Sequence, residues 1–143
     1  MSAVQGGLYM MMDISTSALK AERARMNVYS NNLANMNTTR NEDGTGPYTR
    51  KLVAFKQGDK QITGSNFWGV SVDEILPDYR TEYVKRYDPG HPDADEAGYV
   101  TMPNVNVALE TVDMMVAARA YQANLTAFEA AKQIHSGALQ MIA

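Results

Sequence analysis

The chain has 143 residues, a formal net charge of -3 and no cysteine, and its length suits one modest domain. The lack of cysteine excludes disulfides, thiolate nucleophiles and cysteine-bound zinc. The slight acidic excess offers no attraction for nucleic acid or anionic lipid. Because the longest apolar runs cover only a few residues, no transmembrane helix and no direct membrane insertion are expected.

The N-terminal region reads as the start of a long helix. Residues 1–20, MSAVQGGLYMMMDISTSALK, lack the basic region and long apolar core of a secretory signal, so any export is expected without a cleaved signal peptide. From about residue 9 to 34 there is no Gly or Pro, and the spacing of apolar residues predicts one amphipathic helix. It is expected to end at residues 35–37, because asparagine tolerates the left-handed conformation that terminates helices. The apolar residues form two neighbouring stripes, Leu8, Met12, Leu19, Met26 and Leu33, and Ile14, Ala18, Ala21 and Val28.

Residues 38–103 lose the helical period. Residues 48–55 and 69–75 read as two strands joined as a hairpin, with Gly58, Gly64 and Trp68 at its tip. A third extended segment is predicted where tyrosines alternate with polar residues, at Tyr79, Tyr83 and Tyr87. It leads into a Pro-Gly pair that fits the centre of a type II turn, and residues 91–98 are expected to be an ordered loop.

The C-terminal region carries the strongest helical pattern, from residue 104 to 142, with Asn104 or Asn106 as the N-cap. At 1.5 Å per residue this helix would be about 58 Å long and the N-terminal one about 39 Å. Paired antiparallel, the longer helix would overhang by about 20 Å, and other subunits would have to cover its apolar residues. Two adjacent stripes run along this helix. The stripe of mostly large side chains is Val107, Met114, Ala118, Tyr121, Leu125, Phe128, His135, Leu139 and Ile142. The stripe of mostly small side chains is Ala117, Ala120, Asn124, Ala127, Ala131, Ile134, Ala138 and Met141.

The predicted fold class is mainly α, with long N- and C-terminal helices paired as an antiparallel coiled coil and a small β-hairpin and loop segment between them. The chain divides accordingly into residues 1–37, the N-terminal helix of an inner core domain, residues 38–103, the hairpin and loop segment, and residues 104–143, the C-terminal helix of the core domain.

Acidic residues gather with one histidine in the loop around residues 88–96, but their spacing does not match a calcium-binding loop and prolines interrupt it. His135 has no nucleophile at matched spacing, and the glycine pairs do not continue into phosphate-binding motifs. We therefore expect no catalytic, metal or small-molecule site and no cofactor. A structural role is predicted for the loop residues Asp88, Pro89, Gly90, His91, Pro92 and Asp93.

Several sequence blocks resemble the bacterial flagellar basal-body rod proteins. They are NNLANMNTT at 31–39, YDPGHPDAD at 87–95, MPNVNV at 102–107 and ETVDMM to ARAYQAN at 110–124. The block at 87–95 points to the proximal rod members. The resemblance implies that the terminal helices pair in an inner tube and that the subunit is exported unfolded by the flagellar type III apparatus. It would assemble with copies of itself, other rod proteins and the adapter between rod base and export gate into the drive shaft that crosses the periplasm.

The predicted subunit interface combines the matched family blocks with the helical stripes. Polar residues in an apolar seam must find hydrogen-bond partners and so favour one register. The interface residues are Leu19, Met26, Asn32, Leu33, Asn35, Met114, Ala118, Tyr121, Asn124, Leu125 and Phe128. Two alternatives stay open from the residues alone: a helical adapter or export chaperone that binds a client through its apolar helix faces, and a cell-wall hydrolase using Asp93, Asp95 or Glu96 as paired carboxylates.

Overall fold

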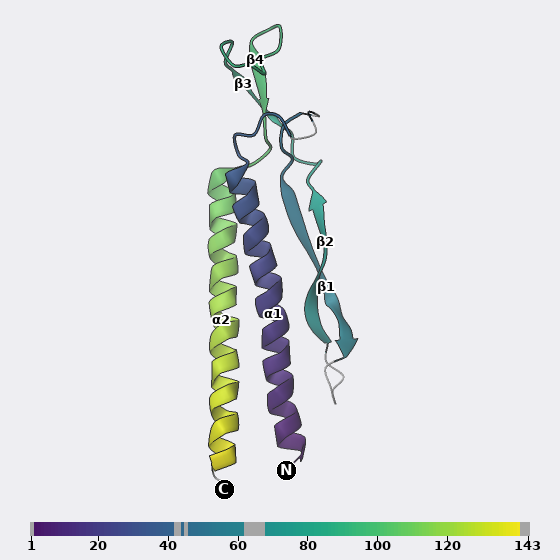
Figure 1. Cartoon of the computed structure of the whole chain (residues 1–143), viewed down its shortest axis with the longest axis vertical. Helices are drawn as coiled ribbons and strands as arrows, with labels where there is room; N and C mark the ends of the chain where they lie inside the picture. Colours follow the sequence, from purple (N-terminus) through teal and green to yellow (C-terminus); the bar gives the residue numbers. More distant parts are fainter. Residues whose placement is uncertain (1, 42–43, 45, 62–67, 141–143) are drawn as a thin grey trace.

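The computed structural model of the chain describes residues 2–41, 44, 46–61 and 68–140. It is an elongated molecule in which one helix lies between a second helix and a β-hairpin, while another short hairpin extends beyond the end of the helix pair (Figure 1). Neither helix of the described residues is long and apolar enough to cross a membrane. The elements, in chain order, are α1 (Ser2–Ala34), β1 (Lys51–Gln61), β2 (Trp68–Pro77), β3 (Val84–Tyr87), β4 (Tyr99–Met102) and α2 (Val107–Gln140).

The two helices pack antiparallel along their whole length, with both chain ends at the same end of the molecule (Figure 1). Ala117 and Ala131 of α2 are almost fully buried, so small side chains let the two helices approach closely. This confirms the predicted mainly α fold with paired terminal helices. A row of buried or half-buried residues runs along α2 in steps of three and four and mixes both predicted stripes: Met114, Ala117, Tyr121, Asn124, Phe128, Ala131, His135 and Ala138.

The predicted difference in helix length is wrong. Helix α1 has 33 residues and α2 has 34, so each is about 50 Å long. Helix α1 continues back through Gly6 and Gly7, although glycine disfavours helix interiors by about 1 kcal/mol each. Leu8, which follows them, is buried. Packing on the partner helix therefore outweighs local propensity, and no 20 Å overhang exists.

Helix α1 ends at Ala34, where the sequence predicted its end, but by a different mechanism. No non-glycine residue in the described ranges has a positive φ, so no asparagine adopts the left-handed conformation. Instead the Asn35 amide N–H donates to the Asn31 carbonyl at 3.1 Å, and Met36 N–H donates to the Leu33 carbonyl at 3.3 Å. The Asn35 side-chain amide also donates to the Asn31 carbonyl at 2.9 Å, and these bonds satisfy two of the last four carbonyls of the helix.

Helix α2 begins at Val107, with Asn106 as its cap. The Asn106 side-chain oxygen accepts hydrogen bonds from the backbone N–H groups of Ala108 at 3.0 Å and Leu109 at 3.3 Å. Of the two predicted cap residues, Asn106 is therefore the correct one. Asn104 is buried and serves a different purpose, described below.

Strands β1 and β2 form the predicted antiparallel hairpin, with Lys51 opposite Pro77 and a bulge between Ala54 and Phe55. Both strands are longer than the sequence indicated. Gly58 lies within β1 and Trp68 begins β2, whereas the predicted tip residue Gly64 falls outside the described residues. The hairpin packs against α1, which thus becomes the middle layer of the molecule.

The second hairpin pairs β3 with β4, with Tyr87 opposite Tyr99. Only the last part of the predicted third extended segment forms a strand, β3, so that of its three tyrosines Tyr87 alone lies in a strand, and β4 was not predicted at all. The type II turn is wrong as well, because Gly90 does not have the positive φ that this turn requires. The turn is closed by His91 N–H donating to the Asp88 carbonyl at 3.1 Å.

Candidate assembly interface

Asn32 lies at the point where α1, α2 and β1 meet, and its side chain is fully buried. Its amide nitrogen donates to the Lys51 carbonyl and to the Glu110 carboxylate, each at 2.9 Å. Its amide oxygen accepts from the Tyr48 hydroxyl and from the Lys51 backbone N–H, again at 2.9 Å. All of its hydrogen-bonding capacity is thus used within one chain, so this predicted interface residue is not on the surface available to a neighbour.

Glu110 is the charged centre of the same region, with 0% of its surface exposed. The Arg50 Nε donates to Glu110 at 2.5 Å, and the same guanidinium lies 3.5 Å from the Asp78 carboxylate. Burial by itself lowers the pKa of Arg50, but the hydrogen bonds and charges of Glu110 and Asp78 raise it above the ordinary value. Burial also raises the pKa of Tyr48, and the Glu110 charge adds to that effect. The buried charges are therefore paired.

Asn104 and Asp78 connect this centre to the loops. The Asn104 oxygen accepts from Arg50 N–H at 2.8 Å, and its amide donates to the carbonyls of Asp78 at 2.8 Å and Thr81 at 3.0 Å. The Thr81 hydroxyl donates to the Asp78 carboxylate at 2.8 Å and lowers the pKa of Asp78, more strongly than burial raises it. We name the whole cluster the polar junction; its members are Asn32, Tyr48, Arg50, Asp78, Asn104 and Glu110.

Stability is expected to depend on the charge of Asp78. Because its folded pKa is lowered, its carboxylate stabilises the fold above the ordinary aspartate pKa of about 3.9 and loses that contribution as pH falls through the lower folded value. In urea unfolding, an Asp78→Asn variant should therefore be less stable than the native chain at pH 7, and the difference should shrink towards pH 3. A difference that grows in acid would contradict the charged role of Asp78.

The remaining predicted interface residues lie in the helix seam or beside it. Asn124 does not bond across the seam; its amide donates to the Ala120 carbonyl of its own helix at 2.8 Å. Within the chain this amide therefore bonds only to its own helix, and its expected role in choosing a neighbouring subunit stays a prediction. Ala118 is exposed, and the others are half-buried: Leu19, Met26, Leu33, Asn35, Met114, Tyr121, Asn124, Leu125 and Phe128.

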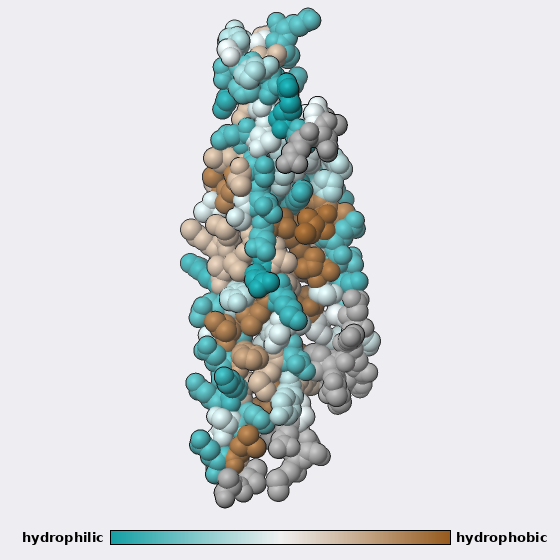
Figure 2. Space-filling view, in the orientation of Figure 1, coloured by the Kyte–Doolittle hydropathy of each residue, from teal (hydrophilic) through white to brown (hydrophobic). Residues whose placement is uncertain are grey.

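Two apolar surfaces outside the predicted interface stay uncovered. One lies on α2 facing away from α1, where Leu109 is 59% exposed and Val112 is 55% exposed. The other lies on the β1–β2 hairpin, where Leu76 is 42% exposed. Figure 2 shows hydrophobic side chains gathered over the hairpin and over α2, with hydrophilic ones between them. The spacing of Leu109, Val112 and Val116 in steps of three and four was the signal that could have revealed the first.

The loop predicted to be structural is tied to the segment that follows α1. The Asp93 carboxylate accepts hydrogen bonds from the Thr39 hydroxyl at 2.8 Å and from the Arg40 guanidinium. The Thr39 hydrogen bond, followed by the Arg40 charge, lowers the pKa of Asp93 despite an opposing effect of burial. His91 is half-buried, and its Nδ1 accepts from the Asp93 N–H at 3.1 Å. Within the described ranges, no three His, Asp or Glu side chains are grouped so as to hold a metal ion.

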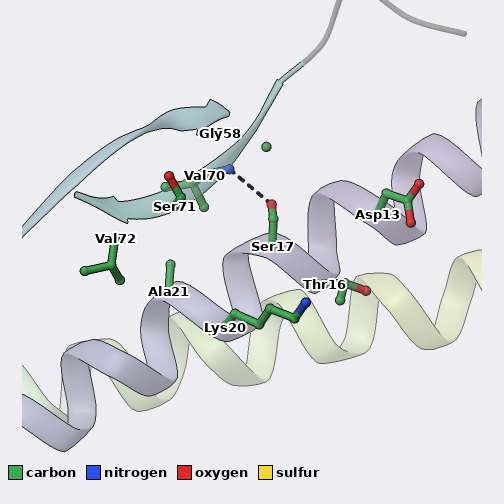
Figure 3. Close-up of a pocket in the computed structure, with 10 residues that line it drawn as sticks. Asp13, Thr16, Ser17, Lys20, Ala21, Gly58, Val70, Ser71 and Val72 are labelled. Atoms are coloured by element: carbon green, nitrogen blue, oxygen red, sulfur yellow. Dashed lines mark hydrogen bonds between the residues drawn. The ribbon is translucent and has the colours of Figure 1, made fainter. Parts of the chain in front are cut away.

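An open groove of about 590 Å³ runs between α1 and the hairpin (Figure 3). Ser17 points from α1 to the backbone of β2, where its hydroxyl accepts from Val70 N–H at 3.1 Å while donating to the Ile14 carbonyl at 2.7 Å. A Cβ added to Gly69 would lie 2.5 Å from the Ser17 oxygen, so only glycine permits this approach. The Ser17 hydroxyl is thus a structural contact between layers.

Replacing Gly69 with alanine is expected to push the hairpin from α1 and to lower the free energy of unfolding by about 1–3 kcal/mol. The matched control is Gly137→Ala in α2, where an added Cβ meets nothing within 4 Å and helix propensity favours alanine. Denaturant unfolding measures both variants. Equal stability of Gly69→Ala and the native chain would show that the layers are not held this closely.

Family models and curated relatives of similar sequence show which protein family this chain belongs to. A family model described as "Flagella basal body rod protein" matches residues 12–40, and one described as "Flagellar basal body rod FlgEFG protein C-terminal" matches residues 96–141. Curated relatives named flagellar basal-body rod protein FlgC include one from Borreliella burgdorferi, 36% identical over 95% of this chain and 98% of its own. The relative from Bacillus subtilis is 40% identical over 91% and 95% of the two chains. The relative from Salmonella typhimurium is 41% identical over 85% and 88%.

The matched segments include most of α1, strand β4 and all of α2, which carry the helix seam and, of the polar junction, Asn32, Asn104 and Glu110. Identity of this level over nearly the full length of both chains leaves no large part of the fold outside the match. The chain belongs to the FlgC family of flagellar basal-body rod proteins.

Proposed function

We propose that this structural rod subunit assembles through the faces of its paired helices, with copies of itself and other rod proteins, into the proximal part of the drive shaft. The supporting observation is the uncovered apolar surface of α2 on an elongated two-helix body. Monomeric proteins rarely expose such continuous apolar strips, and larger ones mark interaction surfaces. Removing the strip from water in an assembly offsets the cost of ordering the subunits.

The polar junction gives the proposed subunit its rigidity. Its buried charges are satisfied only when α1, α2 and β1 hold one register, because a slip would leave a buried carboxylate or guanidinium unpaired at a cost of several kcal/mol. A subunit that transmits torque needs such a fixed arrangement. The division proposed here assigns residues 1–37 and 104–143 to an inner core domain and residues 38–103 to an outward-facing segment.

The proposed partners and location follow from family membership. The subunit would be exported unfolded by the flagellar type III apparatus without a cleaved signal peptide. It would then contact the adapter at the rod base and form part of the rod in the periplasm. The absence of cysteine suits a chain that crosses compartments unfolded, because no disulfide can form on the way. We also propose that it has no enzymatic activity, since Ser17, His91 and His135 are engaged in contacts within the chain.

A fractionation experiment tests the assembly function. A tagged copy of the chain is expressed in cells that lack their own subunit, and isolated basal bodies are probed for it and imaged by electron cryo-microscopy. Incorporation into the rod with restored swimming is expected. Recovery only in small soluble complexes with a client would favour the helical adapter or chaperone, and cleavage of peptidoglycan by the purified chain would favour a hydrolase.

A further inference from the structure

The β3–β4 hairpin and its connecting loop form an arm that extends beyond the helix pair, at the end opposite the two chain ends (Figure 1). One face of the arm carries Lys85, Tyr87 and Tyr99, because Tyr87 pairs with Tyr99 and Lys85 lies two residues before Tyr87. All three are exposed, and the two tyrosine rings meet edge to face. Val100 and Met102, on the other face, are buried. We call the exposed side the tyrosine face; exposed tyrosines of this kind are typical of interfaces.

The arm is fixed on the body of the molecule. Asp93 in its loop accepts hydrogen bonds from the Thr39 hydroxyl at 2.8 Å and from the Arg40 guanidinium. At its base the hydroxyls of Thr49 and Tyr83 are hydrogen-bonded at 2.7 Å. Among the described residues no other helix or strand packs against β3 or β4. The tyrosine face is therefore both held in place and available to another molecule, and such preorganisation lowers the cost of binding.

The groove between α1 and the β1–β2 hairpin is a surface that such an arm fits. Its volume of about 590 Å³ lies in the range of about 300–1,000 Å³ that is typical of binding pockets. Its lining includes the apolar residues Ala21, Val70 and Val72 (Figure 3). Asp13 and Lys20 also line it, about 10 Å apart along α1. In the part of the chain that the structure describes, neither of these two forms an ion pair.

The arm and the groove come to the same height when two copies are stacked end to end along the long axis. Tyr99 precedes Val107, the first residue of α2, by eight residues, so it lies at most about 26 Å beyond the helix pair. Asp13 and Lys20 follow Ser2, the first residue of α1, by about 16 and 27 Å along the helix. The arm of one copy therefore reaches the groove of the next.

The charges along the arm and the groove have complementary order. In the stack, the arm points in the direction in which α1 of the next copy runs (Figure 1). Lys85 lies at the inner end of the tyrosine face, and Asp95 at the outer end, where its carboxylate accepts from Tyr99 N–H at 2.9 Å. Neither charge has an ion-pair partner within the described ranges. On α1, Asp13 comes first and Lys20 follows, so each arm charge meets its opposite.

We propose that the tyrosine face of one subunit docks in the groove of a second copy stacked along the long axis, with Lys85 paired with Asp13 and Asp95 with Lys20. The contact rests on the assembly function proposed above and adds a contact along the shaft. It leaves the exposed faces of α2 free, so it is compatible with paired helices that form an inner tube. Because the arm and the groove are unlike surfaces, the copies repeat head to tail and do not close into dimers.

Cysteine pairs test the contact directly, because the native chain has no cysteine. Lys85→Cys combined with Asp13→Cys in one chain should give a ladder of oligomers when basal bodies are treated with a short thiol-specific cross-linker. Each single variant should give none, whereas a symmetric contact between arms would give dimers of Lys85→Cys. The matched control pairs Lys85→Cys with Thr126→Cys and should also give none. Thr126 is exposed on α2 and lies, like Asp13, roughly 30 Å from the arm end of the helix pair.

Charge reversal supplies an independent measurement. Lys85→Glu and Asp13→Lys should each reduce the number of swimming cells roughly tenfold by placing like charges together, and the double variant should recover to near the native number. Both positions are exposed, so circular dichroism of the purified variants should match that of the native chain. Assembled basal bodies without the ladder, or a double variant no better than the singles, would overturn the proposed contact while leaving the assembly function standing. Absence of the native chain from basal bodies would overturn both.

Discussion

Replacing Glu110 with alanine is expected to lower the free energy of unfolding by about 3–5 kcal/mol, because it breaks a buried ion pair by removing one partner. The Arg50 guanidinium would lose its closest anion, and one donor bond of Asn32 would lose its acceptor. A domain of this size is stabilised by only about 5–15 kcal/mol in total. The variant should therefore be close to unfolding at physiological temperature. Circular dichroism in increasing urea measures the loss.

Glu129→Ala is the matched control, since Glu129 lies on the same helix and is exposed. Its effect should stay within about 0.5 kcal/mol. Glu110→Gln keeps the shape and part of the hydrogen bonding, and should fall between the two. If Glu110→Ala were as stable as the control, the polar junction would contribute little to the fold, and its proposed role in fixing the helix register would fail.

Replacing Leu125 with aspartate is expected to stop rod assembly. Leu125 is half-buried beside the helix seam, so the change removes part of the roughly 1.5–3 kcal/mol that full burial of a leucine contributes and introduces a charge that an assembled interface would have to desolvate. The loss is repeated in every subunit. Because the proposed export route handles an unfolded chain, the variant should still be secreted. Swimming assays together with imaging of basal bodies measure the outcome.

Thr126→Asp is the control, because it places the same charge one residue further along, at an exposed position whose hydroxyl contacts only its own helix. Normal swimming is expected for it. Asn124→Ala should have a small effect, since the Asn124 amide is bonded to its own backbone. Normal rods built from Leu125→Asp would show that this flank faces solvent, and the proposed packing through the helix faces would have to be abandoned.

The sequence by itself determined the elements with strong local signals. The long helices follow from apolar residues in steps of three and four, the end of α1 from its asparagine-rich turn, and the first hairpin from two β-rich runs. Family membership was also readable from short blocks such as residues 31–39 and 87–95. These features depend on residues close together in the chain, which is why periodicity and motif spacing were sufficient to predict them.

Only the tertiary structure decided which residues meet across long separations. Asn32 and Glu110 are 78 positions apart, yet they share a buried hydrogen bond, and no local pattern distinguishes this glutamate from an ordinary residue of the first helical turn. The start of α1 was decided in the same way, because a partner helix stabilises residues whose own propensity is poor. Three of the four residues of strand β4, Tyr99, Val100 and Thr101, favour strands, but so short a run gives no periodicity, and its pairing with β3 fixes it. Contacts between distant segments are set by how faces pack, and that information is absent from spacing alone.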